Sequence, residues 1–150
     1  LIASEKGQAV RFNQENVRAM GRTATGVIGI RMDKDDKAVG MVVADPNKEL
    51  LTITDNGYGK RTDIQEYRLT NRGGKGVINI KTNERNGKVA SVKVVQEDEE
   101  IVIVSREGIL IRTRVDDISK IGRNTQGVRI MRLSQSDTVI SMATFVEDDE

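Results

Sequence analysis

The sequence predicts an all-β protein built from three repeats, and two observations support this prediction. β-Branched residues dominate, with 17 Val, 15 Ile and 11 Thr against 6 Leu and 8 Ala. Such residues suit the pleated surface of a sheet, whereas helices favour unbranched side chains. The second observation is a set of glycines and arginines that recurs at intervals of 50 and 51 residues.

The repeat is defined by six positions. Gly7, Gly57 and Gly108 align with one another, and the same offsets bring five further positions into register. These positions are Arg11, Arg61 and Arg112; Val17, Tyr67 and Ile118; Arg22, Arg72 and Arg123; Gly26, Gly76 and Gly127; and Val27, Val77 and Val128. We place the repeats at approximately 1–49, 50–100 and 101–150. Four strands in a unit of this length correspond to one propeller blade.

Each repeat is expected to contain four strands in the same order. The first strand is apolar, and its predicted ranges are 1–4, 50–54 and 101–105. The second strand carries an arginine, and its ranges are 8–12, 58–62 and 109–113. The third strand is rich in Val and Ile and follows a glycine, at 27–32, 77–82 and 128–133. The fourth is again apolar, at 38–44, 88–95 and 138–146.

The turns and the blade contacts follow from the residue types. Asp55-Asn56-Gly57 and Arg85-Asn86-Gly87 are predicted to be hairpin turns, because Asn-Gly tolerates the positive φ of a two-residue loop. With no Trp and only two Tyr and two Phe, contacts between blades must depend on Val, Ile and Met. Because closed propellers have about four to eight blades, three blades predict a piece of a longer array. A free-standing domain of three repeats is the alternative.

The composition excludes several classes of site. The chain has no Cys and no His, so disulfides, thiolate or imidazole metal ligands and His-dependent catalytic triads are ruled out. No nucleophile–base pair is apparent, which leaves hydrolase and transferase chemistry without support. The absence of a long apolar run argues against membrane insertion, and the lack of Cys is compatible with a cytoplasmic protein.

The charged residues are sorted along the repeat, although the formal net charge is only +1. Segments 6–31, 57–81 and 106–132 together hold 18 basic and 6 acidic residues, and each has a net charge of +4. The rest of the chain holds 6 basic and 17 acidic residues, including 97–100 and 147–150. Equivalent positions of a repeat array lie at equivalent places around its axis, which predicts one basic band. A curved basic band suits the backbone of bent duplex DNA, bound without regard to base sequence.

Nine basic side chains are candidates for phosphate contact. Arg22, Arg72 and Arg123 stand in Gly-containing connections, where exposed backbone N–H groups let a phosphate approach closely. The full set is Arg11, Arg22, Lys60, Arg61, Arg72, Lys75, Arg112, Arg114 and Arg123. An alternative stays open for the arginine in the second strand of each repeat, which could pair with acidic residues across the sheet. Gly26, Gly76 and Gly127 are expected to serve turn geometry in either case.

Two other binding motifs are unsupported. The segment Gly73-Gly74-Lys75-Gly76 lacks the spacing of a nucleotide-binding loop. Asp33, Asp35 and Asp36 have some calcium-loop character, but no bidentate Glu follows at the required distance. Acidic runs such as 97–100 are expected to be solvated turns.

Three features of the sequence resemble the C-terminal domain of the A subunit of bacterial DNA gyrase. They are Asn56-Gly57-Tyr58-Gly59-Lys60-Arg61-Thr62, the repeated Gly-Arg-x-x-x-Gly-Val motif, and Arg112-Thr113-Arg114-Val115 followed by Gly122-Arg123-Asn124-Thr125-Gln126-Gly127-Val128. The resemblance covers essentially all 150 residues. It implies a β-pinwheel of about six blades, a propeller-like fold in which neighbouring blades exchange strands.

The resemblance also implies a function. In that family the domain wraps duplex DNA around a positively charged rim, and wrapping supports ATP-dependent negative supercoiling by the whole enzyme. This implies a non-catalytic module with no cofactor of its own, in a bacterial cytoplasmic protein associated with the nucleoid. The implied partners are duplex DNA, the remainder of the gyrase A subunit and, through it, the gyrase B subunit, with no membrane partner.

Two departures from the family pattern stand out. The family's box Gln-Arg-Arg-Gly-Gly-Arg-Gly belongs to its first blade, whereas the similar stretch 70–76 lies in the second of these repeats and differs in its first two positions. We interpret it as a degenerate copy. Neither Tyr58 nor Tyr67 lies in the context of the family's catalytic tyrosine. The alternatives are the related domain of the topoisomerase IV A subunit and a scaffold whose basic rim docks an acidic partner.

Overall fold

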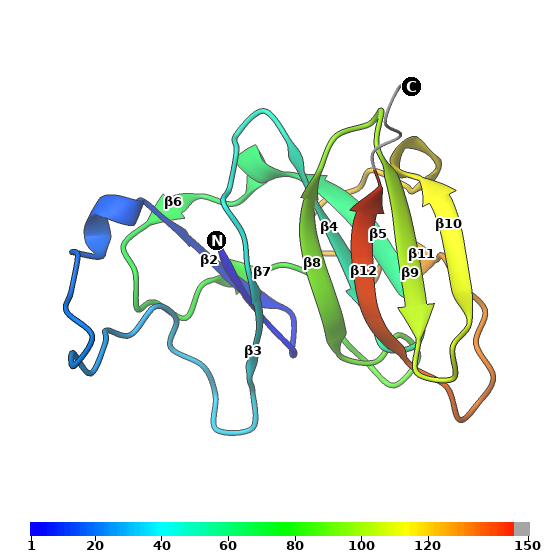
Figure 1. Cartoon of the computed structure of the whole chain (residues 1–150), viewed down its shortest axis with the longest axis horizontal. Coiled ribbons are helices and arrows are strands. Elements are labelled where there is room, and N and C mark those ends of the chain that lie inside the picture. Colours follow the sequence, from blue (N-terminus) through cyan, green and yellow to red (C-terminus); the bar gives the residue numbers. More distant parts are fainter. Residues whose placement is uncertain (146–150) are drawn as a thin grey trace.

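The computed structural model describes residues 1–145, and this part of the chain is all-β, as predicted. Three mainly antiparallel sheets stand side by side (Figure 1). The first contains β1 (Ile2–Ser4), β2 (Gln8–Phe12), β3 (Ala38–Met41), β6 (Leu69–Thr70) and β7 (Val77–Ile78). The second contains β4 (Glu49–Thr54), β5 (Tyr58–Asp63), β8 (Val89–Val95) and β11 (Val128–Arg129). The third contains β9 (Glu100–Ser105), β10 (Leu110–Arg114) and β12 (Val139–Phe145).

The third strand of a repeat joins the sheet of the repeat before it. β7, from the second repeat, pairs antiparallel with β2 and places Val77 opposite Ala9. β11, from the third repeat, pairs in the same way with β5 and places Val128 opposite Gly59. Neighbouring blades therefore exchange strands, which is the arrangement expected of a pinwheel.

A glycine makes this exchange possible. Gly76 precedes β7 with a φ of +80°, and a Cβ there would lie 2.2 Å from the carbonyl oxygen of Ala9. Only a residue without a side chain can bring the loop so close to β2. Gly26 and Gly127 share the positive φ, which confirms that these three glycines serve turn geometry.

The predicted third and fourth strands need correction. The third strands shorten from 77–82 and 128–133 to two residues each, and the predicted strand at 27–32 does not form. A strand needs a neighbour for its ladder of hydrogen bonds, and the described residues contain no sheet in front of the first one for 27–32 to join. The fourth strands are Ala38–Met41, Val89–Val95 and Val139–Phe145, while residue 146 lies outside the described residues.

One of the two predicted hairpin turns is confirmed, and the other is wrong. Asp55-Asn56-Gly57 does join the paired strands β4 and β5, but only Gly57 has a positive φ. The turn at 85–87 is not a hairpin, because β7 and β8 belong to different sheets. The side chain of Asn86 instead donates to the carbonyl oxygens of Lys81 and Gln126, at 2.7 and 3.0 Å, and so ties the second repeat to the third.

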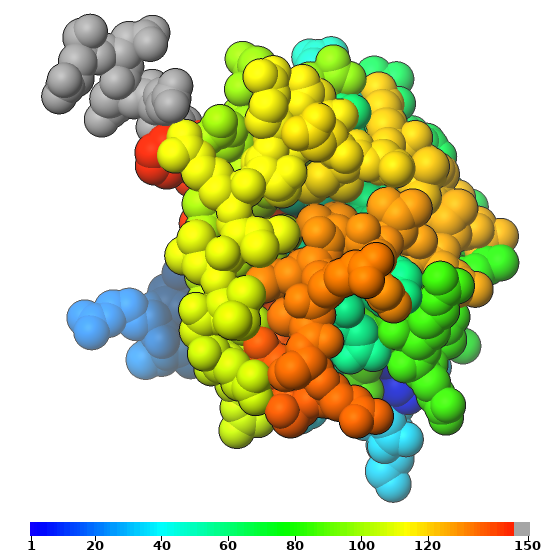
Figure 2. Space-filling view, turned by 90° about the vertical axis from the view of Figure 1, so that its right-hand side faces the viewer, coloured from blue at the N-terminus to red at the C-terminus, as the bar shows by residue number. Residues whose placement is uncertain are grey.

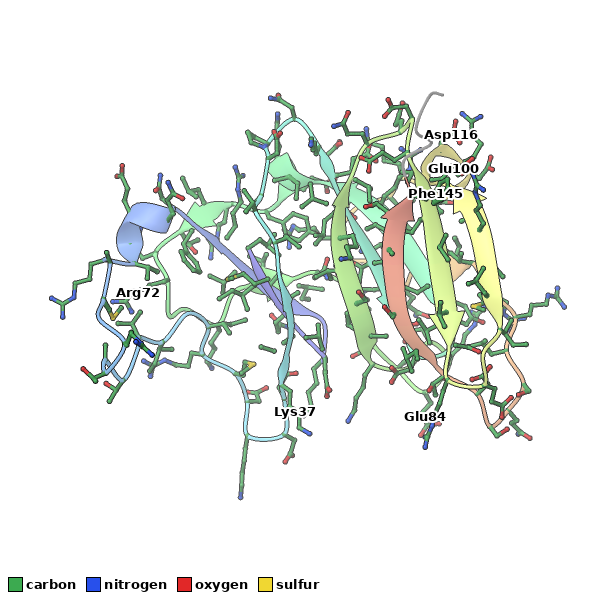
Figure 3. The ribbon with its side chains drawn as sticks, in the orientation of Figure 1. Lys37, Arg72, Glu84, Glu100, Asp116 and Phe145 are labelled. Carbon is green, nitrogen blue, oxygen red and sulfur yellow. The ribbon has the colours of Figure 1, made fainter. Side chains whose placement is uncertain are left out.

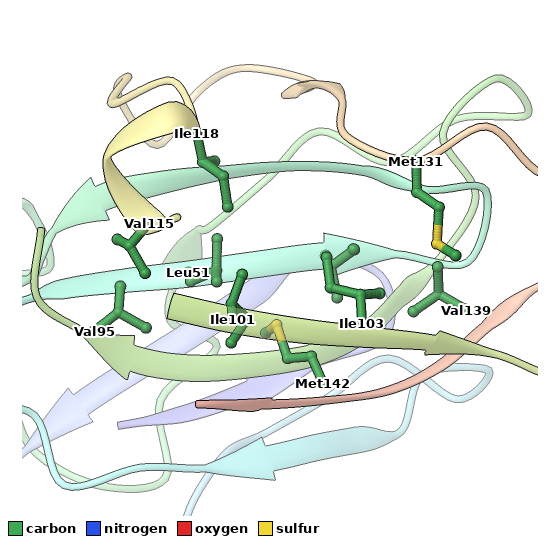
Figure 4. Packing of buried hydrophobic residues seen from close by; sticks show 10 residues of the cluster. Leu51, Val95, Ile101, Ile103, Val115, Ile118, Met131, Val139 and Met142 are labelled. Carbon is green, nitrogen blue, oxygen red and sulfur yellow. The ribbon is translucent and has the colours of Figure 1, made fainter. Parts of the chain in front are cut away.

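Two apolar cores lie between the three sheets. β4 supplies both, because successive side chains of a strand point to opposite faces: Leu50 packs toward the first sheet and Leu51 toward the third. The core between the second and third sheets is rich in Ile, Val and Met, as predicted (Figure 4). Tyr67, 1% exposed, is an addition that the sequence did not predict in the core between the first and second sheets.

Candidate nucleic-acid interface

The Gly-containing connections of the second and third repeats each lie on the third-strand segment of the preceding repeat. In the second repeat, the Gly73 amide donates to the Gly29 carbonyl at 2.7 Å, and the Arg31 amide donates to the Gly74 carbonyl at 2.9 Å. In the third repeat, the Lys81 amide donates to the Thr125 carbonyl at 2.8 Å. The connections are therefore held at equivalent places in successive repeats.

The arginines of these connections repeat the same contact. Arg72 Nη1 donates to the Ile28 carbonyl at 3.1 Å, and Arg123 Nη1 donates to the Ile78 carbonyl at 2.8 Å. Arg72 Nε also donates to the Asn16 carbonyl at 2.9 Å, which places it beside η1 (Gln14–Asn16), as Figure 3 shows. Within residues 1–145 neither arginine forms an ion pair, so both positive charges lack a protein counter-ion.

Arg22 is the exception among the three aligned arginines. Its side chain is exposed, and its connection has no exchanged strand beneath it among the described residues. Its charge is available to a ligand, but its position is less constrained than those of Arg72 and Arg123.

A basic hollow forms where the second connection meets the first sheet. This cavity of about 240 Å³ is lined by Arg11, Arg68 and Lys75 together with the backbone of the glycine segment. Arg11 and Lys75 were predicted site residues, and the structure brings them together across 64 positions of sequence. Arg68 was missed, although Arg18 stands at the equivalent position of the first repeat and could have indicated it.

Lys60 lies inside the protein instead of on its surface. Its ammonium donates three hydrogen bonds, to the carbonyls of Gly122 and Arg123 at 2.7 Å each and to Thr125 Oγ1 at 2.9 Å. The side chain is 0% exposed, so the structure does not support direct phosphate contact by Lys60. Through these hydrogen bonds Lys60 fixes the connection that carries Arg123, and its ammonium group is a buried charge beneath that connection.

Lys60 also gives a prediction for pH dependence. Burial is the main cause that lowers its pKa from 10.5 to about 8; the nearby Glu66 acts in the opposite direction and Arg123 lowers it further. Between these two values the unfolded chain binds more protons than the folded chain, so the free energy of unfolding rises with pH. Urea unfolding between about pH 7.5 and 10 should show the wild-type protein gaining stability relative to Lys60→Met. Parallel pH profiles for the two proteins would contradict this assignment.

Arg61 is also buried in the interior. Its Nη1 lies 2.9 Å from Glu49 and 3.1 Å from Glu97, and its Nε donates to the Ile118 carbonyl at 2.7 Å. The side chains of Arg61 and Glu49 are each only 8% exposed. The structure therefore favours ion pairing over phosphate contact for Arg61. Arg11 makes the equivalent contact with the next repeat, to the Tyr67 carbonyl at 3.1 Å, but without an acidic partner within residues 1–145.

Comparison of the sequence with known protein families agrees with a fold of three repeats. A sequence model of the family described as "DNA gyrase C-terminal domain, beta-propeller" matches residues 1–45, 48–96 and 99–145. The chain belongs to this family. The resemblance predicted from the repeated motifs is confirmed.

Gyrase relatives match over the whole chain. The A subunits of DNA gyrase are 47% identical to it in Haloquadratum walsbyi and 45% identical in Salmonella typhimurium and Staphylococcus aureus, each covering 100% of this chain. The chain spans only 17–18% of the length of these relatives. A solved DNA gyrase A C-terminal domain superposes with a TM-score of 0.90 at 31% identity, covering 97% of this chain and 50% of that one. The C-terminal domain of DNA topoisomerase IV gives a TM-score of 0.88 at 21% identity, covering 95% and 45%, which shows a shared fold.

In the third gyrase repeat two of the predicted site arginines, Arg112 and Arg114, face carboxylates. Arg112 contacts Glu100, and its guanidinium lies 4.2 Å from the centroid of the Phe145 ring. Arg114 forms two hydrogen bonds of 3.0 Å with Asp116. Figure 3 shows these acidic partners and Phe145 gathered at one end of the third sheet. Because exposed ion pairs contribute only about 0–1 kcal/mol, a phosphate could compete for either arginine.

One repeated basic position was not predicted from the sequence. Arg31, Lys81 and Arg132 each follow the aligned glycine of the connection by five residues, and all three are exposed. The repeat alignment places a basic residue at this position in all three repeats of the gyrase domain. The position was missed because its residue type is not the same in every repeat: two are Arg and one is Lys.

The described residues give no support to metal binding. Within residues 1–145, no group of three His, Cys, Asp or Glu side chains is placed to hold a metal ion. Asp36 caps a turn, where its Oδ1 accepts hydrogen bonds from the amides of Lys6 and Lys37 at 2.9 and 2.8 Å. In the same part of the chain, no helix is long and apolar enough to cross a membrane.

Proposed function

We propose that this chain is a sequence-nonspecific duplex DNA-binding and wrapping module of a gyrase A subunit. It would support ATP-dependent negative supercoiling by the whole enzyme, in the cytoplasm at the nucleoid. Its partners would be duplex DNA, the remainder of the A subunit and, through it, the gyrase B subunit. Membership of the gyrase C-terminal domain family supports this proposal.

The observation that carries the proposal is the repeated docking of Arg72 and Arg123. Both lie on the third-strand segment of the preceding repeat, and within residues 1–145 both lack a carboxylate partner. Arginines without an acidic partner at equivalent positions of successive repeats would present positive charge repeatedly to the phosphates of a bent duplex. The contacts would be with the DNA backbone, which gives affinity without base specificity.

Burial guides which residues we propose to contact phosphate. The surface residues that we retain are Arg11, Arg22, Arg72, Lys75, Arg112, Arg114 and Arg123, and we add Arg68. Lys60 and Arg61 act as supports beneath this surface, because both are buried.

Gyrase is favoured over topoisomerase IV for the parent enzyme. The gyrase relatives are 45–47% identical over the whole chain, whereas the solved topoisomerase IV domain is 21% identical. The repeated Arg connections are present in all three units, as expected for a regular wrapping surface.

Salt dependence tests the proposal directly. If about six phosphates are neutralised, the affinity for a duplex should fall on the order of a thousandfold between 50 and 200 mM salt. Fluorescence anisotropy with duplexes of unrelated sequence measures this, and the affinities should agree among the sequences. An affinity that does not change with salt would contradict backbone binding. Stronger competition by an acidic peptide than by duplex DNA at equal salt would favour the protein-scaffold alternative.

A further inference from the structure

A second group of arginines lies away from the connections described above. It surrounds a cavity of about 410 Å³ between the second and third repeats. Three separate parts of the chain form its wall: the β4–β5 hairpin, the turn at 83–87, and β11 with the segment that follows it. Figure 2 shows the last of these, in orange, between the yellow β9–β10 hairpin and the green residues of the second repeat. The residues that shape the site are Asn56, Tyr58, Arg85, Arg129, Arg132 and Asp137.

Tyr58 holds two of the arginines in place. Arg129 Nη2 donates to the Tyr58 hydroxyl oxygen at 2.8 Å, and Arg85 Nε donates to the same oxygen at 3.2 Å. Each guanidinium carbon also lies 5.3 Å from the centroid of the tyrosine ring. Because Tyr58 is only 4% exposed, its ring is a fixed platform for both groups. Two like charges are thus fixed close to a single oxygen atom.

Among the described residues, these charges have no ion-pair partner. Within residues 1–145, Arg85, Arg129 and Arg132 form no ion pair with any Asp or Glu. Asp137 lines the same cavity, but its Oδ1 accepts hydrogen bonds from the Glu107 and Thr138 amides, at 3.0 and 2.9 Å. It therefore caps its turn, as Asp36 does in the first repeat. Bringing like charges together without a counter-ion costs free energy, which an anion in the cavity would recover.

We propose that this cavity binds a phosphate group, held by Arg85 and Arg129 on the Tyr58 platform with Arg132 at its edge. The planar fork of a guanidinium matches the oxygens of a phosphate, and two such groups can bind its oxygens from two sides. The phosphate could belong to a small inorganic phosphate or to a nucleic acid. The proposed site shares no residue with the phosphate-contacting surface above, so it does not depend on the proposed function.

Tyrosine resonances give a direct test with inorganic phosphate as the probe. Tyr58 and Tyr67 are the only tyrosines, and Tyr67 is 1% exposed with its hydroxyl bonded to Asn79, so the two rings can be separated. In protein carrying ¹³C-labelled tyrosine, phosphate and pyrophosphate should shift the Tyr58 signals saturably, whereas acetate at equal ionic strength should not. The double variant Arg85→Gln/Arg129→Gln should lose more than tenfold in phosphate affinity.

The matched control is Lys34→Gln/Lys37→Gln, which removes two exposed basic residues of the first repeat, outside the three basic segments, and the same net charge. It should titrate like the wild-type protein. A linear, unsaturable shift in the wild-type protein, or equal titrations of the site variant and the control, would overturn the proposal. If the site variant folds poorly, the comparison of phosphate with acetate in the wild-type protein still tests the proposal, because it needs no variant.

Duplex binding then identifies the source of the phosphate. A lower duplex affinity in Arg85→Gln/Arg129→Gln than in the control, together with loss of phosphate binding, would assign a nucleic-acid phosphate. An unchanged duplex affinity with the phosphate titration lost would assign a small phosphate. Failure of the salt-dependence experiment would leave the tyrosine titration unaffected, so the two proposals can fail separately.

Discussion

Replacing Arg22, Arg72 and Arg123 together by Ala is expected to lower the affinity for duplex DNA on the order of a hundredfold at 0.15 M salt. The three arginines stand at one position of the repeat, so the variant removes one proposed phosphate contact from every unit. The slope of log affinity against log salt should become shallower by about 3. Anisotropy titrations at several salt concentrations measure both quantities.

Loss of net charge must be separated from loss of contacts. Lys34, Lys37 and Lys88 are exposed and lie outside the three basic segments, so their triple Ala variant is a matched control. It should keep most of the wild-type affinity and slope. Arg72 and Arg123 also donate to the carbonyls of neighbouring strands, at a net contribution of about 1 kcal/mol each, so unfolding curves should accompany the titrations. If the two triple variants bind duplex DNA with equal affinity, the arginines of the connections have a structural role and do not contact phosphate.

Arg61→Leu is expected to destabilise the fold by about 3–5 kcal/mol, because it leaves the buried carboxylate of Glu49 without its main partner. In a protein of this size the melting temperature should fall on the order of 10 °C. Lys120 Nζ, 3.3 Å from Glu49, is half-exposed and cannot replace the buried guanidinium. Thermal and urea unfolding measure the loss.

Two further variants make this prediction specific. Arg61→Leu/Glu49→Leu removes both buried charges and should recover much of the lost stability, because an apolar pair can replace a buried ion pair. Arg112→Leu removes the equivalent arginine of the third repeat, whose side chain is 45% exposed, and should cost far less. Similar losses for Arg61→Leu and Arg112→Leu would contradict the importance of burial.

The different positions of Lys60 and Arg61 show why the candidate site could be predicted only in part. In the sequence both follow Gly59 closely and stand in a basic segment, as expected of surface residues. The repeat alignment held a hint for Lys60, since its equivalents are the apolar Val10 and Ile111. No such hint existed for the carbonyls of the third repeat that surround its ammonium, because strand exchange brings those atoms across more than 60 positions of sequence.

The sequence by itself determined the all-β class, the three repeats, the family and the sorting of charge by repeat. These properties depend on residue type and spacing, which are local or periodic and can be read without coordinates. Only the tertiary structure decided which basic residues are exposed, which of them neutralise a buried carboxylate and which gather around Tyr58. Those outcomes depend on contacts between residues of different repeats. The physical reason is that a third strand completes its hydrogen-bond ladder on the preceding sheet, so each site is assembled from two repeats.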